Sequence, residues 1–370
     1  MRVDLLDAIE NSDPVRALEI FEEELARNGD PWKIHLDLFP SVQRVLNPPF
    51  INPHLPKMYR IYREFVPYLG REDVPALVRV EINEYAQRPK LEKLPKGRIP
   101  GTAVSFEEIE AAIGEHDWHK TAILMAAFRA REGGPEFAGR LLLLGSGYLD
   151  SSLGHSISCT AFILLEMLER DDQDPWSVLA TLADYFCKGR FQTTPDLHRG
   201  PAPTSGEALY HHLLRAVSGR GIVNLHHTIT LYAIERVRHF FDETQYNHLT
   251  GSWIEFMGEK LTEQVKLRGQ GKEPPTDYIE FHEKFSRLEP MPIVEWAGEM
   301  IESQEGRQML GRFLIKGVCN LYQGQYNPHN LTGLGSALWV MENWSDRKEV
   351  ALGALFQYLD YFFQEIRSDS

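Results

Sequence analysis

The chain has 370 residues, of which 43% are hydrophobic and 25% are charged, so it can bury one large core or two of medium size. Its formal net charge is −14, which argues against nucleic acids and anionic membranes as partners. No run of eighteen apolar residues occurs, so we expect a soluble protein without a membrane span. The three cysteines are widely spaced and form no CxxC pair, which predicts a cytoplasmic protein without a disulfide framework.

Apolar residues recur at intervals of three and four along most of the chain, as they do in amphipathic helices. Alternation with a period of two is nearly absent, and the breaks fall at sequences such as SDPV, NGDPW and QDPW, which are typical of helix boundaries. We therefore predict an all-α fold. The clearest predicted helices cover residues 17–29, 57–69, 121–134, 177–189, 231–241 and 354–366.

Two segments differ from the rest in being rich in proline, glycine and basic residues. They cover residues 89–101 and 188–206, and we expect both to be long loops. A loop of such length in a compact protein is usually a functional cover or a linker. Because the second segment lies near the middle of the chain, we interpret it as a connecting loop or a lid.

The two halves of the chain contain similar segments in the same order. Residues 132–158 and 304–332 both run Gly-Arg, apolar helix, Tyr, short turn, His-x-(Ile/Leu)-(Ser/Thr) and a second apolar helix. We infer an internal duplication, with a first helical half at residues 1–187 and a second at 207–370. The two halves would bury their apolar stripes against each other about a pseudo-two-fold axis, as two domains or as one compact domain.

Four histidines, His54, His155, His227 and His329, each precede an apolar helix in this scheme. The macrodipole at a helix N-terminus disfavours a positive ring, so we expect neutral imidazoles that can ligate a metal or accept a proton. If the seam between the halves brings these rings together, they would offer the nitrogen donors that iron, zinc or manganese accept. The alternative is structural, with each ring bonding the first turn of its own helix and a neighbouring tyrosine.

Two aspartates and two tyrosines occupy matching positions in the two halves. Asp184 and Asp360 lie near the ends of the helices that follow His155 and His329, and we expect them to add carboxylate ligands to the metal site. Tyr148 and Tyr322 each stand seven residues before one of these histidines. They are candidates for fixing the histidine tautomer. His155, His329, Tyr148 and Tyr322 are therefore the predicted catalytic residues, with a histidine as ligand or general base.

A second histidine pair, His116 and His119 in HDWH, has the i, i+3 spacing that can chelate a metal on one helix face. It has no equivalent in the second half, which favours an exposed helix start instead. The sequence contains no P-loop, HExxH or GxSxG motif. The histidine-led helices thus remain the main candidates for chemistry.

In these helices, GHSISCTAF, NLHHTITLYA and NPHNLTGLGSAL, the chain resembles the questin oxidase-like family of helical proteins. Similar helical domains also occur fused to Rieske iron–sulfur modules. The resemblance implies oxidative chemistry on a polyketide-like or aromatic substrate. Where that family has a second histidine a few residues further on, this sequence has Ser158 after His155, and no Rieske cysteine–histidine pair follows.

Together these features predict a small-molecule oxidoreductase or oxygenase with a histidine-lined pocket at the seam between the halves. The metal would be iron or another divalent transition metal, with a cofactor-free oxygenase as a further alternative. Aromatic residues beside the named positions suit an apolar or aromatic small molecule. The rival hypothesis is a non-catalytic helical repeat protein that binds a protein partner or small ligand and uses its histidines structurally.

Overall fold

The computed structural model describes residues 2–98, 101, 103–170, 173–189, 191, 206–258 and 272–368. These residues contain twenty α-helices, two short 3-10 helices and no β-strand, which confirms the all-α prediction. The 3-10 helices are η1 (Val66–Tyr68) and η2 (Arg238–Phe240). The α-helices are α1 (Arg2–Glu10), α2 (Pro14–Ala26), α3 (Pro31–Asp37), α4 (Phe39–Val42), α5 (His54–Phe65), α6 (Val74–Ala86), α7 (Phe106–Gly114), α8 (Trp118–Glu132), α9 (Gly134–Ser146), α10 (Leu149–Ser152), α11 (His155–Glu169), α12 (Trp176–Gly189), α13 (Gly206–Ser218), α14 (Gly221–Arg236), α15 (Glu243–Met257), α16 (Tyr278–Phe285), α17 (Pro290–Met300), α18 (Gln304–Asn320), α19 (His329–Asn343) and α20 (Lys348–Ser368).

Several helices begin where the local sequence predicts. The carboxylate of Asp13 accepts a hydrogen bond from the backbone of Arg16, and that of Asp30 accepts one from Trp32. A proline follows each aspartate at the first helical position, where its missing N–H costs nothing. The SDPV and NGDPW sequences therefore start helices through ordinary N-terminal capping.

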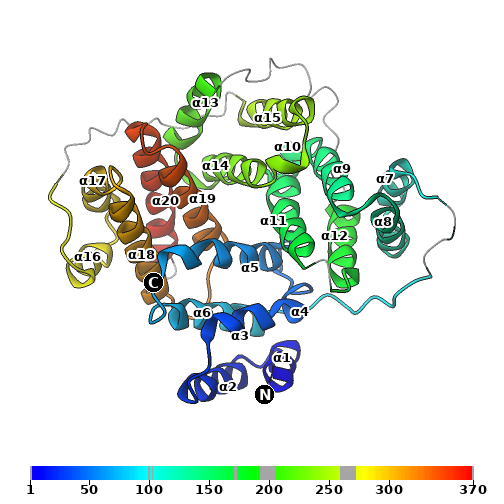
Figure 1. Cartoon of the computed structure of the whole chain (residues 1–370), viewed down its shortest axis with the longest axis horizontal. Coiled ribbons are helices and arrows are strands. Elements are labelled where there is room, and N and C mark those ends of the chain that lie inside the picture. The colour runs from blue at the N-terminus through cyan, green and yellow to red at the C-terminus, as the bar shows by residue number, and fades with distance from the viewer. Residues whose placement is uncertain are drawn as a thin grey trace.

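Four helices form the centre of the molecule (Figure 1). Helix α5 contacts α11, α11 contacts α14, α14 contacts α19, and α19 returns to α5. Their facing surfaces are apolar and aromatic; the rings of Phe162 and Tyr232, for example, lie 5.0 Å apart between α11 and α14. This arrangement brings one end of each of several helices to a common point in the core.

The remaining helices surround this centre (Figure 1). Helices α9 and α12 pack on α11, whereas α20 packs on α14 and α19. The N-terminal helices α1, α2 and α3 pack on α6, and α7 and α8 pack on α12. Because these outer layers cover the central helices, side chains at the central helix ends are withdrawn from solvent.

The order of helices agrees with the predicted halves without proving a duplication. Helices α11 and α19 both have 15 residues, and each begins at a histidine. Each follows a helix that carries the Gly-Arg pair, α9 or α18, and each is followed by one of the predicted aspartate helices, α12 or α20. The duplication itself remains a prediction.

The structure describes most of the first predicted loop and little of the second. Residues 87–98 contain no helix, as expected, and the backbone carbonyl of Leu94 accepts a hydrogen bond from the Trp176 indole. In the second segment Lys188 and Gly189 belong to α12 and Gly206 begins α13. Apart from these residues and Phe191, the segment predicted as connecting loop or lid lies outside the described residues.

The part of the chain that the structure describes has no helix of the length and apolarity that a bilayer crossing requires.

Candidate metal centre

Three of the predicted histidines stand at the first positions of central helices. His54 begins α5, His155 begins α11 and His329 begins α19. Their side chains are buried, with exposed fractions of 1%, 4% and 8%. Gly154, just before His155, has φ +78°, and a Cβ there would lie 2.3 Å from Thr230 Oγ1. Glycine therefore permits both the left-handed turn that starts α11 and its close approach to α14.

The three rings converge on one another. His155 Nε2 lies 2.8 Å from His54 Nε2 and 3.3 Å from His329 Nε2. One ring nitrogen from each of the three histidines lies within 4.8 Å of the other two. The fold thus collects residues that are far apart in the sequence into one buried group that could hold a metal ion.

The fourth ring in this group is His226, where the sequence analysis expected His227. His226 Nε2 lies 3.2 Å from His155 Nε2, and its ring centroid lies 4.5 Å from that of His329. His227 instead packs edge-on against Phe256, with the ring centroids 4.9 Å apart. The reason is that α14 already begins at Gly221, so both histidines lie within the helix and adjacent side chains point about 100° apart. We call His54, His155, His226 and His329 the histidine cluster.

In three of the four rings the outer nitrogen, Nδ1, lies within hydrogen-bond distance of an oxygen acceptor. His155 Nδ1 lies 2.7 Å from the Ser152 carbonyl and His226 Nδ1 lies 2.7 Å from the Ile222 carbonyl. His329 Nδ1 lies 2.7 Å from Asn327 Oδ1. Since these oxygens accept, each Nδ1–H donates and each Nε2 keeps its lone pair toward the cluster. Metal-bound histidines in proteins are held in this way.

His54 differs from the other three rings because its outer nitrogen faces an amide NH₂ group. Its Nδ1 lies 3.4 Å from Asn47 Nδ2, while Asn47 Oδ1 accepts a hydrogen bond from Arg88. With Nδ1 as the acceptor, His54 Nε2 carries the proton and donates to His155 Nε2.

Burial keeps the cluster neutral. It lowers the pKa of His54, His155 and His329 well below the ordinary value of 6.5, and it lowers the pKa of His226 to about 3. The neighbouring histidines and Lys57 lower these pKa values further. The rings are therefore neutral, as expected, but the main cause is burial and not the helix dipole. Neutral imidazole is the form that binds metals.

A buried lysine accompanies the cluster. Lys57 has no exposed surface, follows His54 by one helical turn, and donates from Nζ to Ser158 Oγ at 3.2 Å. Burial lowers its pKa. The sequence analysis did not select Lys57, although its i, i+3 spacing from His54 on an apolar helix indicated that it faces the same way.

The two predicted carboxylate ligands lie elsewhere. Asp184 pairs with Lys188 at 2.7 Å, one turn along α12, and Asp360 receives a hydrogen bond from Arg220 at 2.9 Å. Among the described residues neither aspartate belongs to a group with the spacing of metal ligands. Both stand far along their helices, whereas the cluster lies where α11 and α19 begin.

The two predicted tyrosines are also separate from the cluster. Tyr148 packs against Phe191, with ring centroids 5.4 Å apart, in an aromatic group beside the end of α12. The Tyr322 hydroxyl donates to Glu84 at 2.8 Å. Glu84 in turn pairs with Arg88, so Tyr322 is connected to His54 only through several intervening side chains. The second histidine pair belongs to no group of three or more potential metal ligands among the described residues, and His116 Nδ1 lies 2.8 Å from the Cys187 carbonyl.

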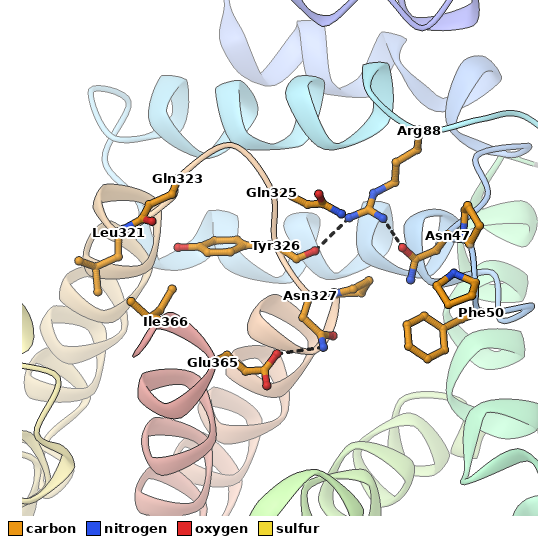
Figure 2. Close-up of a pocket in the computed structure, with 13 residues that line it drawn as sticks. Asn47, Phe50, Arg88, Leu321, Gln323, Gln325, Tyr326, Asn327, Glu365 and Ile366 are labelled. Carbon is orange, nitrogen blue, oxygen red and sulfur yellow. Dashed lines mark hydrogen bonds between the residues drawn. The ribbon is translucent and has the colours of Figure 1, made fainter. Parts of the chain in front are cut away.

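A pocket of about 450 Å³ (Figure 2) is lined by residues that contact the cluster, and the four cluster histidines are not part of its lining. Two of its wall residues, Asn47 and Asn327, contact the outer nitrogens of His54 and His329. The ring of Phe50, also in the wall, lies edge-on to His54 with centroids 6.3 Å apart. The lining combines amides and charged groups with apolar side chains: Asn47, Pro48, Pro49, Phe50, Arg88, Leu321, Gln323, Gln325, Tyr326, Asn327, Pro328, Glu365 and Ile366.

The donor set fits a transition metal. Zinc–nitrogen bonds of about 2.0–2.1 Å place neighbouring nitrogens of a tetrahedral shell about 3.3 Å apart. The 3.3 Å between His155 Nε2 and His329 Nε2 agrees with this spacing, whereas the 2.8 Å between His54 Nε2 and His155 Nε2 is shorter. Imidazole nitrogen suits iron, zinc, copper and nickel alike, so the three-histidine group could hold a metal ion whose identity the geometry does not determine.

Comparison with known proteins finds no matching family model, no matching curated protein and no matching solved structure.

Proposed function

We propose that the protein is a metal-dependent oxidoreductase, specifically an oxygenase, in which the histidine cluster holds iron. Its substrate would be a small apolar or aromatic molecule that reaches the cluster through the adjoining pocket. The observation that carries the proposal is the convergence of buried, neutral Nε2 atoms whose Nδ1 partners keep the lone pairs turned inward. A purely structural role for the histidines does not require such convergence.

In this proposal each part of the site has a defined task. His54, His155 and His329 hold the metal, and His226 provides a fourth ligand or a base, since its neutral Nε2 lies 3.2 Å from His155 Nε2. Bound iron would supply the redox chemistry with molecular oxygen. The covering helices exclude water from the cluster, and the Phe50 ring in the pocket wall offers a face for an aromatic substrate.

The resemblance to the questin oxidase-like family adds support for oxidative chemistry on an aromatic substrate. It rests on the segments GHSISCTAF, NLHHTITLYA and NPHNLTGLGSAL, each of which supplies one cluster residue, namely His155, His226 and His329. Ser158, which stands where that family has a second histidine, accepts a hydrogen bond from the buried Lys57. The predicted catalytic tyrosines have no part in the proposal because Tyr148 and Tyr322 contact other residues.

The second candidate is a non-catalytic helical protein. It is favoured by one observation: His54 and His155 satisfy each other by a 2.8 Å hydrogen bond, so part of the cluster is stable without a ligand.

Metal analysis separates the two candidates. The protein should be produced without a histidine tag, purified without chelator and supplied with Fe²⁺, Zn²⁺ or Mn²⁺. We expect about one metal ion per chain in the unmodified protein and none in the double variant His155→Gln/His329→Gln. His211→Gln is the matched control, because His211 is 67% exposed on α13; this variant should keep the full metal content.

Oxygen consumption with hydroxylated and unsubstituted aromatic compounds then tests the reaction itself. Consumption that depends on bound iron and is absent from the double variant would support an oxygenase. A protein that binds none of the three metals, and whose double variant retains full stability, would instead support the non-catalytic candidate.

A further inference from the structure

One cluster histidine owes its orientation to a side chain that is distant in the sequence. Asn327 Oδ1 accepts from His329 Nδ1 at 2.7 Å and from the His329 backbone N–H at 3.2 Å. On its other side, Asn327 Nδ2 donates to Glu365 Oε2 at 3.1 Å. Figure 2 shows Asn327 and Glu365 facing each other across the pocket wall. We call Glu365 and Asn327 the carboxylate–amide relay.

The chemistry of the relay permits only one arrangement of protons. A carboxylate accepts and does not donate, so the NH₂ group of Asn327 must face Glu365. The amide oxygen must then face His329, and it can only accept. His329 Nδ1 therefore carries the proton, and Nε2 is left with its lone pair toward His155. Glu365 in α20 and the His329 backbone N–H thus both hold the Asn327 amide in one orientation, and that orientation sets the tautomer of the ring at the start of α19.

The other two rings that donate from Nδ1 do not depend on such a contact. His155 bonds the carbonyl of Ser152, three residues earlier, and His226 bonds that of Ile222, four residues earlier. Backbone carbonyls cannot exchange donor and acceptor positions, whereas an amide side chain can rotate by 180°. His329 is therefore the member of these three whose tautomer would be uncertain without a fixed partner for the amide.

We propose that Asn327 and Glu365 are positioning residues that hold His329 in the tautomer required for metal binding. The direct prediction concerns only the proton on His329. The consequence for metal affinity rests on the proposed metal site, where loss of an outer partner of a ligating histidine typically weakens binding by about 10–100-fold.

The tautomer can be read by ¹⁵N NMR of protein labelled at histidine and kept in chelator, with His329→Gln used to assign the signals. In the unmodified protein we expect His329 with a protonated Nδ1 and an unprotonated Nε2. Asn327→Leu should give a mixture of tautomers, and Glu365→Met should give a smaller fraction of the second tautomer, because the His329 backbone N–H still donates to Asn327 Oδ1. An unchanged His329 spectrum in both variants would overturn the proposal.

A reversed pair provides a stringent control. In Asn327→Asp/Glu365→Gln a carboxylate would accept from His329, and the new glutamine amide would donate to that carboxylate. This double variant should restore the single tautomer of His329. Its affinity for Zn²⁺, measured in competition with a chromogenic chelator, should lie within about twofold of that of the unmodified protein. The affinity of Asn327→Leu should be about 10–100-fold lower. Asn343→Leu, at an exposed position of α19, the helix that begins at His329, should change neither the His329 tautomer nor the affinity for Zn²⁺.

The two proposals fail in different ways. If the unmodified protein binds no metal but the tautomer responds to the variants as described, the relay stands and the oxygenase proposal falls. If metal binds and the reversed pair shows mixed tautomers like Asn327→Leu, the positioning role is wrong while the metal site stands.

Discussion

Each histidine of the cluster is kept neutral by its removal from water. Charging an imidazole there would bury a cation among other rings and beside Lys57, whose amine is itself fully buried. The first cause of the lowered pKa is the same for all four, namely burial. The neutral rings could consequently bind a metal at neutral pH without a net loss of protons.

These pKa shifts predict a loss of stability in mild acid. A histidine whose folded pKa lies below its unfolded value of 6.5 takes up a proton only on unfolding as the pH falls from 6.5 toward the folded pKa. The contribution of these histidines to the free energy of unfolding should thus be constant above about pH 7 and should fall below pH 6.5, by up to about 1.4 kcal/mol per pH unit for each such ring. Urea unfolding in the presence of chelator at pH 7.5, 6.0 and 5.0 measures this slope.

A variant isolates the contribution of one ring. His226→Gln should reduce the slope between pH 6.0 and 5.0, because the folded pKa of His226 is about 3. The exposed-site variant His211→Gln should leave the slope unchanged. Equal slopes in the unmodified protein and His226→Gln would mean that His226 is not held neutral in the folded state.

Helices α5 and α11, which carry two of the cluster histidines, are joined by a buried ion network. Glu166 of α11 accepts from Arg63 at 2.6 Å and from Arg60 at 3.4 Å, and it also pairs with Arg170. Its side chain is 1% exposed. Glu169, one turn later, pairs with Arg60 at 2.6 Å and with Arg63 at 2.9 Å, but it is 42% exposed. The two carboxylates thus share partners and differ in burial.

Removal of the buried carboxylate should be far more costly than removal of the exposed one. Glu166→Gln would remove the carboxylate that pairs with Arg170 and leave Arg60 and Arg63 with the more exposed Glu169. Loss of one partner of a buried pair costs about 3–5 kcal/mol. Glu169→Gln should cost about 1 kcal/mol or less, because water screens its pairs. Chemical unfolding at pH 7.5 measures both values. Similar losses in the two variants would show that the stability comes from the arginines' packing and not from the buried carboxylate.

Across the whole molecule, the cluster draws its rings from α5, α11, α14 and α19, which contact one another in a closed series. The sequence distance between His54 and His155 is 101 residues, and that between His155 and His329 is 174. A metal bound there would join segments from both predicted halves. Such a ligand can bind only the folded chain with full affinity, since the unfolded chain does not bring these rings together.

Metal binding should therefore raise the thermal stability of the whole protein. A ligand at one hundred times its dissociation constant stabilises a folded protein by about 2.7 kcal/mol. We expect added Zn²⁺ to raise the midpoint of thermal unfolding and added chelator to reverse the rise. The variant His155→Gln/His329→Gln should show no rise. An equal increase in this variant would place the stabilising zinc at other residues.

The features that the sequence predicted correctly are local. The three- and four-residue spacing of apolar side chains gave the helices, and Asp13 and Asp30 were recognisable as helix starts because capping involves only neighbouring residues. His54, His155 and His329 were identified because each leads an apolar helix. His227 was chosen in place of His226 because the choice depends on where α14 begins, and Gly221 starts that helix earlier than the sequence indicated.

Other members of the site escaped the sequence analysis because their roles depend on contacts between distant segments. Asn47 and Asn327 are ordinary loop amides until the fold places them against His54 and His329. Asp184 and Asp360 matched each other along the sequence, yet each pairs with a nearby basic residue. Matching position in two segments indicates a related place in the fold, but the direction of a side chain also depends on packing.

By itself, the sequence determined that the chain is helical, where many of its helices begin, and that histidines lead several of the most apolar ones. It could do so because helix periodicity and capping are set by residues a few positions apart. Only the tertiary structure decided that four imidazoles meet, which of two adjacent histidines joins them, and which nitrogen of each ring faces inward. Those outcomes follow from the packing of helices and from hydrogen bonds across more than a hundred residues, for which no short-range pattern carries the information.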